Sequence, residues 1–127
     1  MTRDESTVGA AMHRGVITCS PGSSGVTVAR IMAAHHIHSV VVPGGSSSCI
    51  ITDADLAAAL HEDVLSTTTA SEIAKVSLVV APSDTLQAAA ERMHARGTTH
   101  AVVVEPRSKE LIGVLSVLDI ANALALR

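Results

Sequence analysis

The sequence contains no Phe, Tyr or Trp among its 127 residues. Without aromatic side chains, the protein cannot bind a base or another ring by aromatic stacking, and its core must be filled by Val, Ile, Leu, Met and Ala. Hydrophobic residues still make up 47% of the chain. This length and composition allow one compact domain or two closely packed halves, but not two independent domains.

Basic charge and cysteine are also scarce. Nine Lys or Arg residues stand against twelve Asp or Glu residues, for a formal net charge of −3. No basic run is present that would neutralise a series of phosphates, so we do not expect nucleic acid as a partner. Cys19 and Cys49 are too few for a disulfide framework or a cysteine zinc site, and we expect them to be small buried residues in a reducing compartment.

Long hydrophobic runs are missing as well. Apolar stretches such as residues 37–42 and 101–104 end well before the length that a membrane-spanning helix needs. The first fifteen residues carry acidic side chains where a signal peptide would have a basic region followed by an apolar one. We therefore expect a cytoplasmic protein with no membrane segment.

What the sequence does contain is an internal repeat. Residues 17–32, ITCSPGSSGVTVARIM, align with residues 78–93, LVVAPSDTLQAAAERM, at an offset of 61. Residues 50–56 match residues 114–120 at an offset of 64, and the three extra residues are expected in the turn at 105–110. Two copies of one motif are therefore predicted, at 7–62 and 68–127.

The pattern within each copy predicts the element order β-α-β-β-α. Residues 16–19 and 78–81 are expected to form the first strands, which end at Pro21 and Pro82 because proline cannot donate to a strand ladder. The first helix of copy two is expected to begin at an N-cap Ser83 and to end at Gly97, where a positive φ is favoured.

A hairpin and a second helix complete each copy. Short apolar runs separated by turn residues predict hairpins, at 40–42 with 49–51 around the turn 43–45, and at 101–104 with 111–115. The last helix is expected from Asp53 to Leu60 in copy one and from Val117 to Leu124 in copy two. Each copy alone would be marginally stable, so we expect the two to share a core.

These residues carry a resemblance to a known family. VITCSPGSSGVTVARIMAAHHIHSVVV followed by CIITDADL, and KVSLVVAPSDTLQAAAERMHARGTTHAVVVE followed by IGVLSVLDI, each resemble a CBS repeat. The resemblance implies an α+β fold in which two repeats pack sheet to sheet as a pseudo-two-fold pair, a Bateman module. It also implies adenosine-containing ligands, such as AMP, ADP, ATP or S-adenosylmethionine, in the clefts between the repeats, and a disc-like homodimer. No cofactor is required, and the effector protein is not identified.

The family's ligand motif is a Gly, two apolar residues, Thr or Ser, two variable residues and Asp. Copy two matches it with Gly113, Ser116 and Asp119, whereas copy one has Thr52 and Asp55 but replaces the Gly with Cys49. A carboxylate can accept both ribose hydroxyls, and a hydroxyl beside a helix N-terminus favours a phosphate oxygen. The same spacing is that of a capping box, which needs no ligand. The two roles are compatible.

The resemblance assigns two binding sites of unequal quality. His100 is expected to donate to a phosphate, more strongly when protonated, whereas Ser39 at the aligned position carries no charge. The aligned positions hold few Lys or Arg residues, which favours AMP over a triphosphate. The stronger predicted site comprises Thr99, His100, Ala101, Ser116 and Asp119 with Val16 and Ile17. The weaker one comprises His38, Ser39, Val40, Thr52 and Asp55 with Ser77 and Leu78.

Other functions find less support. His35 and His36 are expected at the end of a helix and His38 in a loop, so their side chains should diverge, and we expect no metal site. No spacing typical of a nucleophile elbow, a phosphate loop or a metal hydrolase is present, so we do not expect an enzyme. The sequence predicts a regulatory module that binds an adenine nucleotide and transmits its state by conformational or oligomeric change. The alternative is a ligand-free CBS pair that acts as a protein-interaction or dimerisation module.

Overall fold

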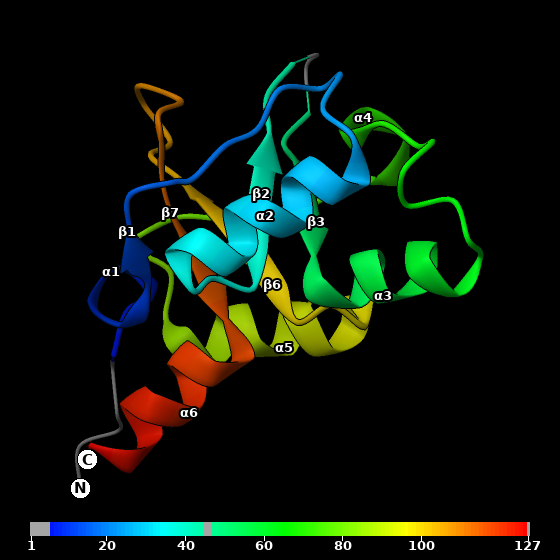
Figure 1. Ribbon diagram of the computed structural model, residues 1–127. Coiled ribbons are helices and arrows are strands. Elements are labelled where there is room, and N and C mark those ends of the chain that lie inside the picture. The colour runs from blue at the N-terminus through cyan, green and yellow to red at the C-terminus, as the bar shows by residue number, and fades with distance from the viewer. Residues whose placement is uncertain (1–5, 45–46, 127) are drawn as a thin grey trace, which may run out of the picture. The chain divides into compact units, whose positions relative to one another are not determined.

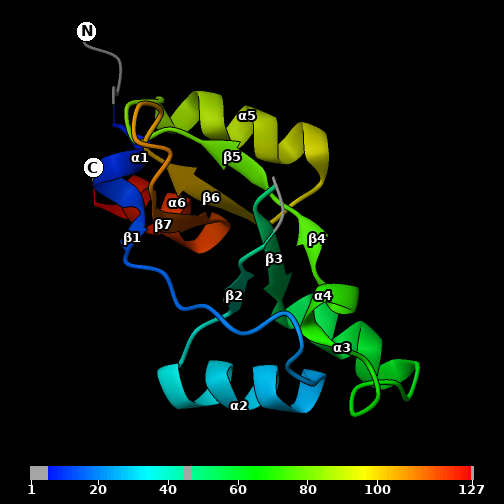
Figure 2. The same ribbon diagram turned by 90° about the horizontal axis from the view of Figure 1, so that it is seen from above.

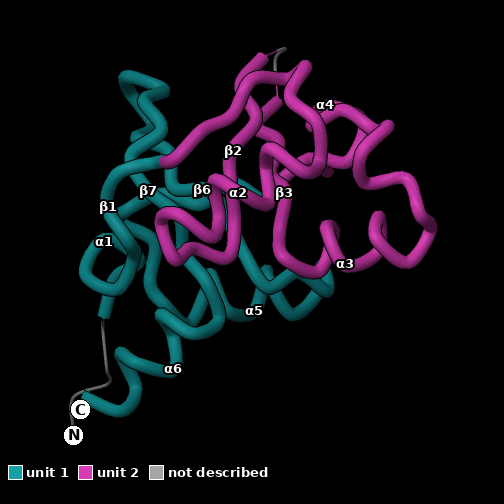
Figure 3. The backbone as a smooth tube through the Cα atoms, in the orientation of Figure 1, with its two compact units in different colours: residues 1–16, 78–127 teal, residues 17–77 magenta. Residues whose placement is uncertain are grey.

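A computed structural model describes residues 6–44 and 47–126 (Figure 1). The chain forms two compact units: unit 1 comprises Met1–Val16 and Leu78–Arg127, and unit 2 comprises Ile17–Ser77 (Figure 3). Gly45 of the predicted hairpin turn and Arg127 at the end of the predicted second repeat lie outside the described residues.

Unit 1 contains a four-stranded sheet in the order β1 (His13–Arg14), β7 (Leu111–Ser116), β6 (His100–Val104) and β5 (Leu78–Val80). Strands β5 and β6 are parallel, and the other pairs are antiparallel. Its helices are α1 (Val8–Ala11), α5 (Leu86–Arg96) and α6 (Val117–Ala125), and Figure 2 shows α5 running alongside β5. The buried core of this unit is aliphatic, formed by Val8, Met12, Leu78, Val80, Leu86, Ala89, Met93, Ala101, Val103 and Leu115.

Unit 2 contains a three-stranded antiparallel sheet in the order β2 (Ser39–Val42), β3 (Cys49–Thr52) and β4 (Lys75–Val76). Its helices are α2 (Gly25–His35), α3 (Asp53–His61) and α4 (Ala70–Ile73). Helix α2 ends at His36, which adopts the left-handed conformation with φ 53°. The core has the same character as that of unit 1, with Cys19, Val28, Met32, Val40, Val42, Ile51 and Ala70 buried.

The predicted α+β class, both hairpins and the last helix of each copy are confirmed. Two local predictions are wrong. Residues 16–19 form only a single parallel bridge, between Thr18 and Val41, although the aligned residues of copy two form β5 ahead of the matching Pro82. The N-cap of α5 is Thr85 rather than Ser83, because Asp84 first closes a turn by accepting from the Ala81 N–H at 2.9 Å.

Two short segments were not predicted. Helix α1 and strand β1 follow an N-cap at Thr7. Helix α4 and strand β4 follow an N-cap at Thr69, 62 positions later. Helix α1 buries Val8 in the core of unit 1, and α4 buries Ala70 in the core of unit 2. The compact units therefore divide the chain differently from the sequence repeats, whose boundaries at 7–62 and 68–127 stay a prediction.

Helix α1 is tied to the start of the second repeat by backbone hydrogen bonds. The Val8 N–H donates to the Asp84 carbonyl and the Gly9 N–H donates to the Pro82 carbonyl, each at 2.9 Å. None of the helices within the described ranges has the length and hydropathy needed to span a bilayer.

Shortening Val8 tests whether α1 belongs to this core. Val8 is fully buried, so Val8→Ala should lower the free energy of unfolding by about 1 to 3 kcal/mol through lost burial and a residual cavity. Urea unfolding followed by circular dichroism measures the effect. The matched control is Val117→Ala, at a side chain that is 49% exposed, where the change should stay within about 0.5 kcal/mol. Equal effects at the two positions would contradict the packing of α1.

Candidate functional site

In unit 1, five of the seven residues predicted for the stronger site meet where hairpin β6–β7 leads into α6. The antiparallel register places His100 opposite Ser116 and Ala101 opposite Leu115. The Val117 N–H then donates to the Thr99 carbonyl at 3.0 Å, which joins the start of α6 to the residue before β6. The hairpin thus brings residues 99–101 beside Ser116, and Asp119 follows in the first turn of α6.

Ser116 and Asp119 form a capping box, as their spacing predicts. The Asp119 N–H donates to Ser116 Oγ at 3.1 Å, and the Ser116 N–H donates to Asp119 Oδ2 at 2.8 Å. These reciprocal bonds satisfy two backbone donors at the helix N-terminus. They also hold the carboxylate in one orientation, so any ligand meets it already positioned.

A residue that we did not predict contacts this carboxylate. Nδ1 of His13, on strand β1, lies 2.6 Å from Asp119 Oδ1. The Asp119 side chain is only 3% exposed, whereas that of His13 is 78% exposed. His13 reaches this position because β1 pairs with β7 in a register that puts His13 opposite Val114. The offset of 62 that relates Thr7 to Thr69 also relates His13 to Lys75, and this recurrence could have identified the residue.

The motif glycine of copy two makes the approach of β1 possible. A Cβ at Gly113 would overlap the carbonyl oxygen of His13 and lie 3.1 Å from Met12 Sδ. Because the obstacle is backbone, a side chain there would have to displace β1. Gly113 therefore has a structural role in seating His13.

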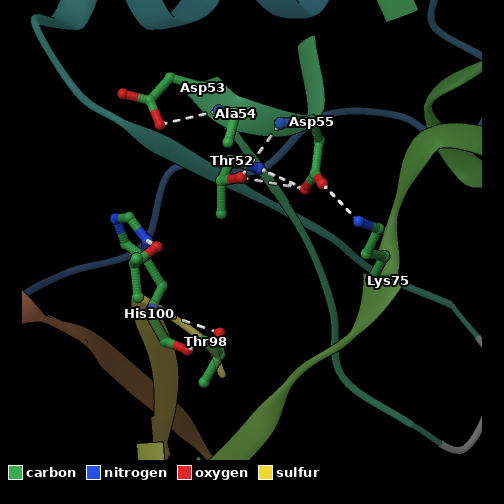
Figure 4. A network of polar contacts seen from close by, with 8 residues as sticks. Thr52, Asp53, Ala54, Asp55, Lys75, Thr98 and His100 are labelled. Carbon is green, nitrogen blue, oxygen red and sulfur yellow. Dashed lines mark hydrogen bonds and ion pairs between the residues drawn. The ribbon is translucent and has the colours of Figure 1, made fainter. Parts of the chain in front are cut away.

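Unit 2 repeats the arrangement without the glycine. The Asp55 N–H donates to Thr52 Oγ1 at 3.3 Å, and Asp55 Oδ2 accepts from the Thr52 N–H at 2.9 Å and from its hydroxyl at 3.1 Å (Figure 4). Lys75 Nζ on β4 lies 3.0 Å from Asp55 Oδ1. Cys49 sits opposite Val76 in the β3–β4 pair, so the replacement of glycine does not abolish strand pairing.

Three more residues predicted for the weaker site, His38, Ser39 and Val40, lie where hairpin β2–β3 leads into α3. Ser39 is opposite Thr52 and Val40 is opposite Ile51 in hairpin β2–β3. The Asp53 N–H donates to the His38 carbonyl at 3.0 Å, as Val117 does to Thr99 in unit 1. Nδ1 of His38 lies 3.0 Å from Asp53 Oδ2, so this exposed histidine pairs with the first residue of α3.

His100, the predicted phosphate contact, is a buried residue with its own hydrogen bonds. Its Nδ1 lies 2.9 Å from Thr99 Oγ1. The Thr98 hydroxyl donates to its carbonyl at 3.0 Å, as Figure 4 shows. The Thr99 hydroxyl therefore holds the imidazole ring of His100. Its contact with a phosphate stays a prediction.

Each predicted site also includes two residues that open a first strand. Val16 belongs to unit 1 and Ser77 to unit 2, together with the hairpins of their predicted sites. Ile17 belongs to unit 2 and Leu78 to unit 1, so neither lies in the unit that holds the hairpin of its predicted site. Their participation in the two sites stays a prediction. Within its own unit, Leu78 pairs with Ala101, and the Ile17 carbonyl accepts from the Val41 N–H.

The cysteines and histidines bring no further chemistry to this geometry. Both cysteines are free; Cys19 is buried as expected, whereas Cys49 is only half-buried. Burial raises the pKa of the Cys19 thiol. Within residues 6–44 and 47–126, no three His, Cys, Asp or Glu side chains are grouped so that they could hold a metal ion.

Comparison with known proteins identifies a match over nearly the whole chain. The family model described as CBS domain matches residues 8–62 and again residues 67–126. No significant sequence match was found among curated proteins.

Several solved structures share the fold. The CBS domain protein PAE2072 from Pyrobaculum aerophilum, complexed with AMP, is 23% identical with a TM-score of 0.80, over 95% of this chain and 99% of that one. The CBS domain pair of protein MJ0100, in complex with 5-methylthioadenosine and S-adenosyl-L-methionine, is 20% identical with a TM-score of 0.82, over 96% and 98%. A hexameric CBS-CP12 protein from bloom-forming cyanobacteria is 20% identical with a TM-score of 0.82, over 91% of this chain and 66% of its own.

Adding a side chain at position 113 tests the close approach of β1. Gly113→Ala should lower the free energy of unfolding by about 1 to 3 kcal/mol, because β1 must shift to make room for the new methyl group. Gly22→Ala is the matched control, since a Cβ at Gly22 has no neighbour within 4 Å. Chemical denaturation of both variants measures the difference. A Gly113→Ala protein as stable as the control would show that β1 does not depend on this glycine.

The two thiols should differ in reactivity. A raised pKa lowers the thiolate fraction of Cys19 at neutral pH, and its burial blocks access. Iodoacetamide should therefore alkylate Cys49 faster than Cys19 in the folded protein, as measured by mass spectrometry of peptides over time. In urea the two rates should converge. Equal rates without denaturant would contradict the burial of Cys19.

Proposed function

Because the chain belongs to the CBS-domain family, we propose that it is a regulatory module that binds an adenosine-containing ligand, with AMP favoured, through the Ser116–Asp119 end of hairpin β6–β7. CBS-pair proteins are in general regulatory and non-catalytic. The observation that carries the proposal is the buried carboxylate of Asp119, which the capping box holds in a single orientation beside residues 99–101.

The chemistry of this end of the hairpin suits a ribose. An ionised carboxylate has about four acceptor positions on its two oxygens. The Ser116 N–H uses one position on Oδ2 and His13 contacts Oδ1, which leaves one position on each oxygen for a vicinal diol. Helix α6 is nine residues long, and its N-terminus favours a negatively charged group such as a phosphate. Aliphatic side chains would enclose the adenine, since the chain has no aromatic residue.

Two structural relatives support the choice of an adenosine ligand. One was solved with AMP, and the other with 5-methylthioadenosine and S-adenosyl-L-methionine. These three compounds share the adenosine group and differ at the 5′ position. The preference for AMP rests on charge, because none of the predicted site residues is a Lys or Arg that could compensate a triphosphate.

The proposed module transmits its ligand state by a conformational or oligomeric change in the cytoplasm. A ligand shifts such an equilibrium only by its difference in affinity for the two states. We propose a homodimer as the assembly that responds and an effector protein that reads the response.

A second candidate function is a ligand-free interaction or dimerisation module. Helix α6 and the residue after it favour this candidate, because they leave large apolar side chains exposed to solvent. These are Val117, Leu118, Leu124 and Leu126. Exposed apolar groups of this kind are suited to burial against a protein surface.

Titration of the purified protein separates the two functions. Calorimetry and thermal shift with AMP, ADP, ATP, NAD and S-adenosylmethionine should detect binding, with a stabilisation of about 2.7 kcal/mol when the ligand is at 100 times its Kd. Asp119→Ala should abolish this stabilisation and cost the apo protein at most about 0.5 to 2 kcal/mol, the value of a helix cap.

The matched control is Asp55→Ala, which removes the corresponding carboxylate of copy one and should leave binding at Asp119 intact. If Asp119→Ala binds as tightly as the wild type, the ligand site lies elsewhere. If no ligand binds to the wild type, the interaction module becomes the better account of the protein.

A further inference from the structure

Each motif carboxylate is contacted by a basic side chain from a two-residue strand. His13 on β1 contacts Asp119 at 2.6 Å, and Lys75 on β4 contacts Asp55 at 3.0 Å. The two strands occupy equivalent places, because β1 is the edge neighbour of β7 and β4 is the edge neighbour of β3. The contact is therefore a repeated feature of the fold.

These contacts use acceptor positions on both oxygens of each carboxylate, the same oxygens that a ribose would contact. In Asp119, Oδ2 accepts from the Ser116 N–H and Oδ1 from His13. In Asp55, Oδ2 accepts twice from Thr52, and Oδ1 contacts Lys75. The carboxylates are only 3% and 10% exposed, whereas the His13 and Lys75 side chains are 78% and 77% exposed. A ribose that approaches either carboxylate from solvent would therefore meet an exposed basic side chain already in contact with it.

We propose that His13 and Lys75 compete with ribose for the motif carboxylates, and that the chemical difference between these two residues decides which carboxylate a ligand reaches. The proposal rests on the proposed function. A lysine keeps its charge throughout the neutral range, whereas a histidine changes its charge between about pH 5 and 8. Protonated His13 holds Asp119 as an ion pair. Neutral His13 retains only an Nδ1–H hydrogen bond, which is easier to displace.

The proposed competition predicts the direction in which the affinity for a ligand at Asp119 changes with pH. Affinity at Asp119 should rise with pH as His13 loses its charge, whereas protonation of His100 would favour a phosphate and act in the opposite direction. Adenosine has no phosphate and so isolates the effect of His13. The other titratable or charged side chains on the elements packed against α6 and β7 are Arg14 on β1, His100 on β6, and Glu91, Arg92, His94 and Arg96 on α5.

The test is calorimetric titration of the full chain with adenosine and with AMP at about pH 6 and about pH 8. Wild-type protein should bind adenosine about 2- to 5-fold more tightly at the higher pH, the range expected for loss of one partly exposed ion pair. His13→Gln keeps an uncharged donor and should lose the pH dependence. His13→Ala should bind more tightly than the wild type at the lower pH. Arg14→Ala, the neighbouring position on β1, should keep the wild-type pH dependence.

Lys75 supplies the complementary test. Lys75→Ala should uncover Asp55 and add a second adenosine site, which should persist in Lys75→Ala/Asp119→Ala and disappear in Lys75→Ala/Asp55→Ala. Urea unfolding of each variant verifies that it is folded.

The outcomes separate this inference from the proposed function. If adenosine binding depends on Asp119 but His13→Ala binds no more tightly than the wild type at either pH, competition is overturned and the proposed function stands. If Lys75→Ala gains no site, the role of Lys75 is overturned. If neither ligand binds to the wild type or to any of these variants, both the competition and the proposed function fail.

Discussion

The close approach of strand β1 to strand β7 is the constraint on which the Asp119 end of unit 1 depends. This approach is possible because Gly113 has no side chain at the point where the His13 carbonyl passes. Once β1 is seated, Val8 of α1 and its C-cap residue Met12 are buried in the core, and His13 reaches Asp119. The absence of a side chain at Gly113 therefore allows both the packing of the N-terminal segment and the contact of His13 with Asp119.

Much of the fold follows from the sequence because the repeat is strong. Both hairpins and the last helix of each copy are visible as short apolar runs and helix starts, and the Ser116–Asp119 capping box follows from spacing alone. The strand at 16–19 was wrong, because a pattern that forms β5 in copy two does not show that the aligned residues of copy one make only one bridge. Val8 and Ala70 were missed as core residues, because a four-residue helix has too few positions to show periodicity.

The candidate site was predictable only in part, for a related reason. Motif spacing identifies residues that are close in the sequence, such as Ser116 and Asp119, and hairpin register adds residues 99–101. The contact between His13 and Asp119 spans most of the chain and depends on a two-residue strand, for which no pattern in one copy gives a signal. Only comparison of the two copies, which pairs His13 with Lys75, reveals it.

The way in which the units divide the chain has a consequence for how they could be isolated. Unit 2 is one continuous segment, Ile17–Ser77, whereas unit 1 joins Met1–Val16 to Leu78–Arg127. A fragment cut before Ile17 and after Ser77 would carry every strand and helix of unit 2, including α4 and β4. A fragment that begins at Leu78 would lack α1 and β1, and with them the core residue Val8 and the His13 side chain that contacts Asp119. The point at which the chain can be divided is therefore not the boundary between the sequence repeats.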